Sequence, residues 1–167
     1  DFFAEKKTGK TTGWIAYTYS HSERKFEEIN YGETFLYRYD RPHMLKIALN
    51  QKLNTKWNVG ITWNMMSGSM ATIATQKDWF ELIHEIKCYR VPTYHRLDIS
   101  VNHSKQRKWG KTLFSIGVYN VYNRKNIYNV KMEEVPYSKR TYGTAIYYVN
   151  EKSLFPIMPS INYKIEF

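Results

Sequence analysis

Apolar and polar residues alternate along six segments of this sequence. In one of them, WNVGITWNM, the apolar positions are Trp57, Val59, Ile61, Trp63 and Met65, and the polar or small positions between them are Asn58, Gly60, Thr62 and Asn64. The same period of two occurs in residues 13–22, 43–53, 96–102, 112–120 and 159–167. Because successive side chains of a β-strand point to opposite faces, each segment predicts a strand with one apolar and one polar face.

Two kinds of protein produce such strands. In a soluble sandwich or small barrel the apolar face points to a core. In an outer-membrane barrel it points to lipid, and the polar face lines a lumen. The polar face here is rich in small residues and carries Arg96 and Asp98 two positions apart, which favours a lumen. Trp57 and Trp63 are separated by roughly 20 Å of strand, at about 3.3 Å per residue, close to the spacing of aromatic girdles.

The connections between these segments alternate in length. Short connections are expected near residues 54–56 and 104–111, and long ones near 23–42, 67–94 and 122–148. Outer-membrane barrels have this pattern because their periplasmic turns are short and their extracellular loops are long, whereas a sandwich gives no reason for it. We therefore expect an all-β fold of about six antiparallel transmembrane strands with long extracellular loops.

Two of the long connections contain further patterns. Residues 77–87 place apolar side chains at helical spacing and predict a short amphipathic helix. Residues 126–135 and 144–155 both favour strands, and we expect them to pair as a hairpin.

The last predicted strand ends on a phenylalanine. Phe167, Ile165, Tyr163 and Ile161 are apolar, and the residues between them are polar or charged. This pattern is typical of the signal that the outer-membrane assembly machinery recognises, so these four residues are predicted to form that signal. The alternative is a soluble strand that finishes the chain.

Four motifs, in this order, resemble the C-terminal part of TonB-dependent outer-membrane receptors of the Bacteroidetes type. They are Arg41-Pro-His43 followed by a strand that ends in Ser67-Gly68, then Tyr94-His-Arg96-Leu-Asp98, then a turn with Asn120 and Asn123, and finally Pro156-x-x-Pro159-Ser160. The similarity extends from about Gly13 to Phe167.

The resemblance implies that residues 1–167 are the C-terminal part of a 22-stranded barrel, with no plug domain in this chain. It implies uptake of a nutrient (siderophore, vitamin, glycan or peptide) across the bacterial outer membrane. The implied partners are the rest of the barrel and the plug, TonB through the missing N-terminal part, outer-membrane lipid and lipopolysaccharide, and a surface lipoprotein. Arg96, Asp98, Asn58 and Asn64 are then expected to face the lumen.

The composition limits the partners, metals and reactions that the chain is expected to have. The chain has 25 basic and 15 acidic residues, a formal charge of +10. The basic residues form no long run, which argues against a nucleic-acid partner and fits contact with lipopolysaccharide phosphates around the rim. Cys88 is the only cysteine, so an internal disulfide is excluded. The five histidines lack the spacing of a metal site, and no serine lies in a nucleophile motif; we expect no cofactor, no metal and no enzymatic activity.

Candidates for substrate contact are aromatic residues of the long connections: Tyr37, Tyr39, Trp79 and Phe80. Packing within the loops is the alternative role. Two other functions stay open. One is a complete eight-stranded outer-membrane barrel, adhesin-like or lipid-modifying, with the stretches near Ile127 and Ile146 counted as spans. The other is a soluble β-barrel that binds a ligand and has its apolar face inward.

Overall fold

The computed structural model describes residues 1–72, 88–136, 138 and 147–167. Seven strands form one antiparallel sheet in the order β1-β2-β5-β6-β9-β10-β13. Their bounds are β1 Phe2–Lys6, β2 Thr11–Tyr19, β5 His43–Lys52, β6 Trp57–Met66, β9 Tyr94–Arg107, β10 Gly110–Tyr119 and β13 Met158–Glu166. The predicted all-β class and the antiparallel pairing are confirmed.

All six expected strands are present, and the sheet contains one more. The additional strand is β1, whose sequence FFAEK puts two phenylalanines side by side and so lacks the alternation that marks the others. The sheet is open: β1 and β13 lie at its two edges, and among the described residues they do not pair with each other. A closed barrel is therefore not formed by this part of the chain.

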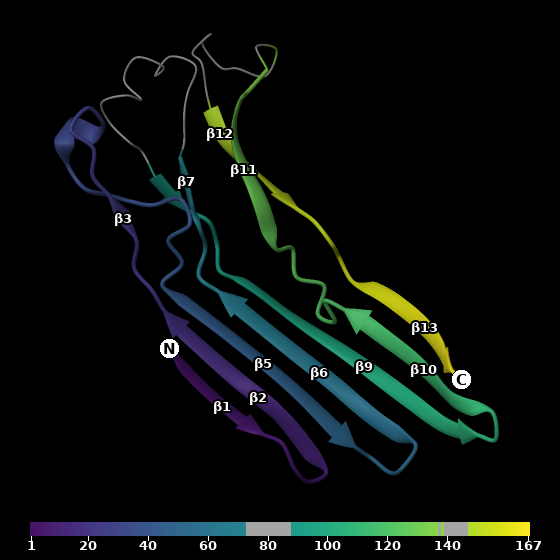
Figure 1. Cartoon of the computed structure of the whole chain (residues 1–167). Coiled ribbons are helices and arrows are strands. Elements are labelled where there is room, and N and C mark those ends of the chain that lie inside the picture. Colours follow the sequence, from purple (N-terminus) through teal and green to yellow (C-terminus); the bar gives the residue numbers. More distant parts are fainter. Residues whose placement is uncertain (73–87, 137, 139–146) are drawn as a thin grey trace.

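The alternation of connection lengths is confirmed. Short turns of residues 7–10, 53–56 and 108–109 join β1 to β2, β5 to β6 and β9 to β10. All three lie at one end of the sheet, and the long connections leave from the other end (Figure 1). We call these the short-turn end and the long-connection end.

The long connections carry short elements of their own. β3 (Glu23–Arg24) pairs with β4 (Phe35–Leu36), β7 (Met70–Thr72) with β8 (Cys88–Arg90), and β11 (Ile127–Glu134) with β12 (Tyr147–Ser153). A 3-10 turn, η1, spans Asn30–Gly32. The predicted hairpin is thus confirmed as β11–β12, which extends away from the main sheet (Figure 1). The helix predicted for 77–87 lies outside the described residues.

The strand register gathers the apolar positions on one face. Residues directly opposite each other in antiparallel strands share a face. Rows that cross the sheet on this apolar face run Ile15–Ile47–Trp63–Leu97 and Leu49–Ile61–Ile99–Val118. The opposite, polar face carries rows such as Asn50–Gly60–Ser100–Gly117–Ser160. The alternation seen in single segments therefore extends across the sheet from β2 to β13.

The apolar face has no second layer over it. Among the described residues only Met70 and Val91 are buried hydrophobics, and both lie in the second long connection rather than on the sheet. On the sheet, Leu49 is 42% exposed, Ile116 47% and Ile161 74%. A soluble sandwich covers such a face with a second sheet, so the described residues do not form a sandwich.

Aromatic and histidine side chains border the apolar face at both ends. Near the long-connection end, His43 lies with its ring centroid 6.2 Å from Tyr17 and 5.4 Å from Tyr19, and the centroids of His95 and Tyr122 are 5.4 Å apart. Near the short-turn end, the Trp57 and His103 centroids are 4.5 Å apart. Trp63 lies inside this border, opposite Ile47 and Leu97.

The apolar stretch between the two borders has a defined height. On β9, His95 and His103 are eight residues apart, and the residues of the same face between them are Leu97, Ile99 and Val101. At about 3.3 Å per residue this is roughly 26 Å of strand. The outward apolar band of a membrane barrel is about 25 Å tall and is flanked by aromatic girdles.

Candidate functional site

The polar face carries a cluster of partnered side chains near the long-connection end. Arg96 donates from Nε to Asp98 Oδ2 at 2.9 Å and from Nη1 to the hydroxyl of Tyr94 at 3.0 Å, and it also bonds the hydroxyl of Tyr119. Its guanidinium carbon lies 4.0 Å from the centroid of the Tyr119 ring. The ion pair expected between Arg96 and Asp98 is present. The hydrogen bonds from Arg96 hold the hydroxyl groups of Tyr94 and Tyr119 in place on this face.

The other two polar residues predicted to face a lumen lie on the same face. Asn64 is directly opposite Arg96 on the neighbouring strand. Asn58 is opposite Asn102, whose Nδ2 donates to Asn58 Oδ1 at 2.8 Å. All four predicted residues therefore share one face, and their place in a lumen stays a prediction.

Next to this cluster is a cavity of about 370 Å³. Its walls come from β6, β9 and β10 and from all three long connections. The residues that matter for ligand chemistry are Arg41, Met66, Tyr94, Tyr119, Tyr128 and Phe155. The rings of Tyr119 and Phe155 meet edge to face, with centroids 6.2 Å apart.

Arg41 supplies a positive charge to the cavity. Its Nη1 lies 3.5 Å from the sulfur of Met66, and no carboxylate among the described residues is within ion-pair distance of it. Aromatic rings bury flat apolar groups, and a guanidinium binds anionic or carbonyl oxygens. The cavity therefore suits a ligand with a flat organic body and an oxygen-rich or anionic group.

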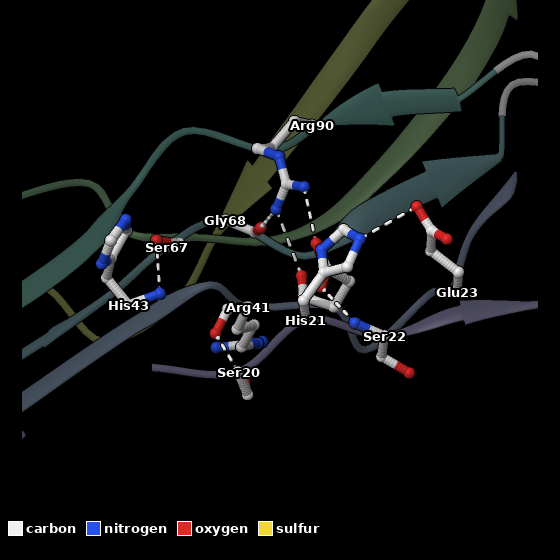
Figure 2. A network of polar contacts seen from close by, with 10 residues as sticks. Ser20, His21, Ser22, Glu23, Arg41, His43, Ser67, Gly68 and Arg90 are labelled. Atoms are coloured by element: carbon white, nitrogen blue, oxygen red, sulfur yellow. Dashed lines mark hydrogen bonds and ion pairs between the residues drawn. The ribbon is translucent and has the colours of Figure 1, made fainter. Parts of the chain in front are cut away.

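An ion pair between a buried carboxylate and a partly exposed arginine joins the first two long connections (Figure 2). Asp40 is 1% exposed, and its Oδ2 accepts from Nη2 of Arg90 at 2.7 Å. Arg90 Nη1 donates to the backbone oxygens of Asp40 at 3.2 Å and Gly68 at 2.9 Å, and Asp40 Oδ1 accepts from the backbone N–H of Ser22 at 2.9 Å. This arrangement, which we call the Asp40–Arg90 clamp, holds the two connections together beside the cavity.

The clamp is expected to stay closed at mildly acidic pH. Burial alone raises the pKa of Asp40, but the hydrogen bonds from Arg90 and Ser22 and the charge of Arg90 outweigh it and hold the pKa below its ordinary value. A lowered pKa means that the stabilisation is complete above the ordinary aspartate pKa and is lost as the pH falls through the lowered one. We expect hydrogen exchange at the Ser22 amide to stay slow at pH 5, after correction for the intrinsic rate.

Removal of the cation tests the same clamp. Arg90→Gln leaves the buried carboxylate without its charged partner, and a hydrogen bond to a charged group contributes about 1.5–3 kcal/mol. Because Arg90 is 35% exposed, we expect a loss of stability at the low end of this range. Such a loss corresponds to roughly tenfold faster hydrogen exchange at the Ser22 amide. Arg38→Gln, at an exposed position in the first long connection, is the control; equal effects of the two variants would contradict the role of the clamp.

The third long connection is fixed by Asn120, which is fully buried. Its backbone N–H donates to Asp98 Oδ1 at 2.9 Å, and its Nδ2 donates to the backbone oxygens of Arg124 at 2.9 Å and Phe155 at 3.1 Å. Its Oδ1 accepts from the N–H of Arg124 at 3.0 Å. Asn120 thus joins the start of the connection to its end and places Phe155 beside the cavity.

Asn126 extends this arrangement to β9. Its Oδ1 accepts from the backbone N–H of His95 at 3.1 Å, and its Nδ2 donates to the oxygen of His95 at 3.0 Å. The side-chain amide of Asn126 thereby makes the two backbone hydrogen bonds to His95 that a neighbouring strand would otherwise make. The motif with Asn120 and Asn123 was visible in the sequence, but its role was not, because it depends on Phe155, 35 residues further along the chain.

The aromatic residues predicted to contact substrate are placed elsewhere or not described. The rings of Tyr37 and Tyr39 pack edge to face, with centroids 5.4 Å apart. The guanidinium carbon of Arg24 lies 4.2 Å from the centroid of the Tyr37 ring, and that of Arg38 lies 5.9 Å from the centroid of the Tyr39 ring. Neither lines the cavity. Trp79 and Phe80 lie outside the described residues. Contact of these four residues with substrate stays a prediction.

The residues predicted as an assembly signal lie on the apolar face of edge strand β13 and beyond its end. Ile161, Tyr163 and Ile165 are directly opposite Ile116, Phe114 and Thr112 of β10. Phe167 is 97% exposed, and its ring centroid lies 5.8 Å from that of Trp109 at the short-turn end. Recognition of these residues during assembly stays a prediction.

The described residues contain no group of three or more His, Cys, Asp or Glu side chains placed to hold a metal ion. No helix within the same ranges has the length and hydropathy needed to cross a bilayer.

No protein-family model matches the chain, and searches of curated proteins and of solved structures also found no match. Function is therefore inferred from the residues and their arrangement.

Proposed function

We propose that this chain is the C-terminal barrel portion of a TonB-dependent outer-membrane receptor that takes up a nutrient. The seven main strands form part of the barrel wall, and the apolar face lies against acyl chains. The polar face lines the lumen, where the plug packs. The long connections are extracellular, and the short turns are periplasmic.

The observation that carries the proposal is the uncovered apolar face. A sheet must bury its hydrophobic face against another layer, and burial contributes about 25 cal/mol per Å² of apolar surface. The described residues supply no such layer, although apolar side chains line this face from β2 to β13. Lipid acyl chains can cover the apolar face without a second sheet. The roughly 26 Å of strand between His95 and His103 fits the height of the apolar band of a membrane barrel.

The polar face supports a lumen that holds a plug. Its centre is nearly free of bulky side chains, because Gly60 and Gly117 lie beside Ser100 and Ser160. A Cβ on Gly60 would lie 2.7 Å from Ser100 Oγ, so a larger residue at position 60 requires the Ser100 side chain to move. Such a surface allows another domain to approach the sheet closely.

The open sheet and the hairpin favour a portion of a large barrel over a complete small one. Bacterial barrels of a single chain have an even number of strands, at least eight, and the sheet has seven. β11 and β12 pair only with each other among the described residues, so they are not counted as spans. The missing strands, the plug and the segment that engages TonB are then supplied by the rest of the receptor.

In this proposal the cavity beside Arg41, Tyr119 and Phe155 belongs to the substrate path. It opens on the polar face at the extracellular end, and the Asp40–Arg90 clamp and Asn120 hold its walls. Transport is driven by TonB, which acts on the plug. The chain itself contributes wall, lumen lining and loops, and no catalytic group.

Purification of the chain distinguishes the three functions. The proposal expects that the isolated chain does not form a compact, heat-modifiable species in detergent, and that the chain tagged in cells co-purifies with the barrel and plug in outer membranes. Heat-modifiable migration of the chain alone supports the eight-stranded barrel. Folding in buffer without detergent supports the soluble module.

Uptake tests the transport itself. Cells are given isotope-labelled ferric siderophore, cobalamin, oligosaccharide or peptide, and the proposal expects that uptake of at least one of these requires residues 127–153 and is abolished by a proton uncoupler. Equal uptake of all four probes with and without those residues contradicts the proposal.

A further inference from the structure

Most of the net positive charge of the chain lies at the short-turn end. The turns and the strand ends next to them contain ten of the 25 basic residues and two of the 15 acidic ones, Glu5 and Glu166. The ten are Lys6, Lys7, Lys10, Lys52, Lys56, Lys105, Arg107, Lys108, Lys111 and Lys164. This end therefore carries +8 of the formal +10. The sequence hides the cluster, because the residues come from four separate segments that only the sheet brings together.

These ten side chains, which we call the basic rim, are exposed and mostly unneutralised. Glu5 pairs with Lys7 at 3.3 Å, and Glu166 pairs with Lys164 at 2.7 Å. No carboxylate among the described residues is within ion-pair distance of the other eight. The rim thus needs counter-charges from outside the described chain.

Part of the rim surrounds a hollow of about 550 Å³ at the short-turn end, which Trp57 also lines. Lys10, Lys52 and Lys56 line it together with hydroxyl and amide side chains such as Thr55 and Asn58, and no carboxylate contributes. Lys52 N–H donates to the oxygen of Lys10 at 2.8 Å, and Ser104 N–H donates to the oxygen of Lys56 at 2.7 Å. These backbone bonds hold the neighbouring turns side by side, so the three lysines converge.

The rim adjoins aromatic side chains that suit a membrane interface. Trp57 is 41% exposed, Trp109 52% and Phe167 97%. Tryptophan prefers the headgroup level of a bilayer, and lysine can lie along apolar surface with its ammonium in water. The basic rim therefore continues the apolar face at the level where lipid phosphates lie.

We propose that the basic rim binds the phosphate headgroups of an anionic phospholipid leaflet. The assignment to the periplasmic leaflet rests on the proposed function, in which the short turns are periplasmic. Anionic headgroups attract basic side chains near the surface, and eight unpaired cations provide the charge complementarity. The composition suggested that the basic residues contact lipopolysaccharide at the extracellular rim. Most of the net positive charge lies instead at the other end of the sheet, the short-turn end.

Lipid binding tests this inference. The receptor that co-purifies with the tagged chain is kept in detergent and titrated with short-chain phosphatidylglycerol or short-chain phosphatidylcholine, and binding is followed by tryptophan emission. The rim variant carries Lys10→Gln, Lys52→Gln, Lys56→Gln, Lys105→Gln and Lys108→Gln. The control variant removes five exposed charges near the long connections: Lys25→Gln, Arg38→Gln, Lys125→Gln, Lys131→Gln and Lys152→Gln. Circular dichroism checks that both variants keep their strand content.

We expect the receptor with the native chain to bind phosphatidylglycerol more tightly than phosphatidylcholine, and the receptor with the rim variant to bind phosphatidylglycerol at least about tenfold more weakly. The control variant is expected to lose less than about threefold. Equal losses for both variants, or no preference for phosphatidylglycerol, overturn the inference but leave the proposed function standing. Competition by inorganic phosphate beyond that of sodium chloride at equal ionic strength identifies a free-phosphate site instead. Absence of the tagged chain from outer membranes contradicts the proposed function, and with it the assignment to the periplasmic leaflet.

Discussion

Ile61→Arg is expected to prevent stable insertion of the sheet into a bilayer, whereas Thr62→Arg is expected to be tolerated. The two residues are neighbours on β6 but point to opposite faces. Ile61 is in the apolar row between Leu49 and Ile99, and Thr62 is opposite Asp98 on the polar face. An arginine on the lipid side near the bilayer centre costs about 2–4 kcal/mol, and one on the lumen side costs little.

The measurement is the fraction of protein recovered in folded form from outer membranes for each variant. A cost of about 2–4 kcal/mol corresponds to roughly a thirtyfold to thousandfold shift between inserted and uninserted protein, because about 1.4 kcal/mol is a factor of ten. At position 62 the new guanidinium lies near the carboxylate of Asp98, whose Oδ2 already accepts from Thr62 Oγ1 at 3.4 Å. Loss of both variants to the same extent contradicts the assignment of faces.

Asn120→Ala is expected to release the third long connection. The side chain is fully buried and makes three hydrogen bonds to the backbone of Arg124 and Phe155. Truncation leaves those backbone groups unpaired, at about 1–3 kcal/mol for a buried group. It also places alanine at φ 54°, which costs it roughly 1–2 kcal/mol. We expect a local loss of about 2–5 kcal/mol.

Asn123→Ala is the matched control. Asn123 has a similar φ of 52°, but it is exposed, and its side chain accepts a single hydrogen bond, from the N–H of Ile157 at 2.9 Å. The backbone cost is thus nearly the same in both variants, and the difference reports the buried hydrogen bonds. Hydrogen exchange at Arg124 is expected to accelerate by more than about thirtyfold in Asn120→Ala and by much less in Asn123→Ala. Equal acceleration would mean that the buried amide contributes nothing.

The strand pattern predicted the sheet well, because each strand has one uniform face. The period of two in residues 57–65 and its counterparts is a local property, and the register only aligns faces that already exist. β1 was missed because Phe2 and Phe3 lie on opposite faces at an edge of the sheet, where neither face is uniform.

Less of the candidate site could be predicted from the sequence. The pair of Arg96 and Asp98 was predicted because the two residues are two apart on one strand. The Asp40–Arg90 clamp joins residues 50 positions apart in connections without regular periodicity, so no local signal exists for it. The basic rim is a third case: its lysines look scattered along the chain and converge only because every short turn lies at the same end of the sheet.

The central claim is that the apolar face lies against lipid, and spin labels along β6 test it most directly. In the Cys88→Ser background, single cysteines replace residues 58, 59, 61, 62, 63, 64 and 65; residue 60 is omitted because a Cβ there would meet Ser100 Oγ at 2.7 Å. Labels at 59, 61, 63 and 65 are predicted to be accessible to oxygen, which dissolves in the bilayer, and protected from a water-soluble nickel chelate. Labels at 58, 62 and 64 are predicted to show lower oxygen accessibility. Protection of the odd-numbered labels from both reagents, as in a packed protein core, would contradict the account.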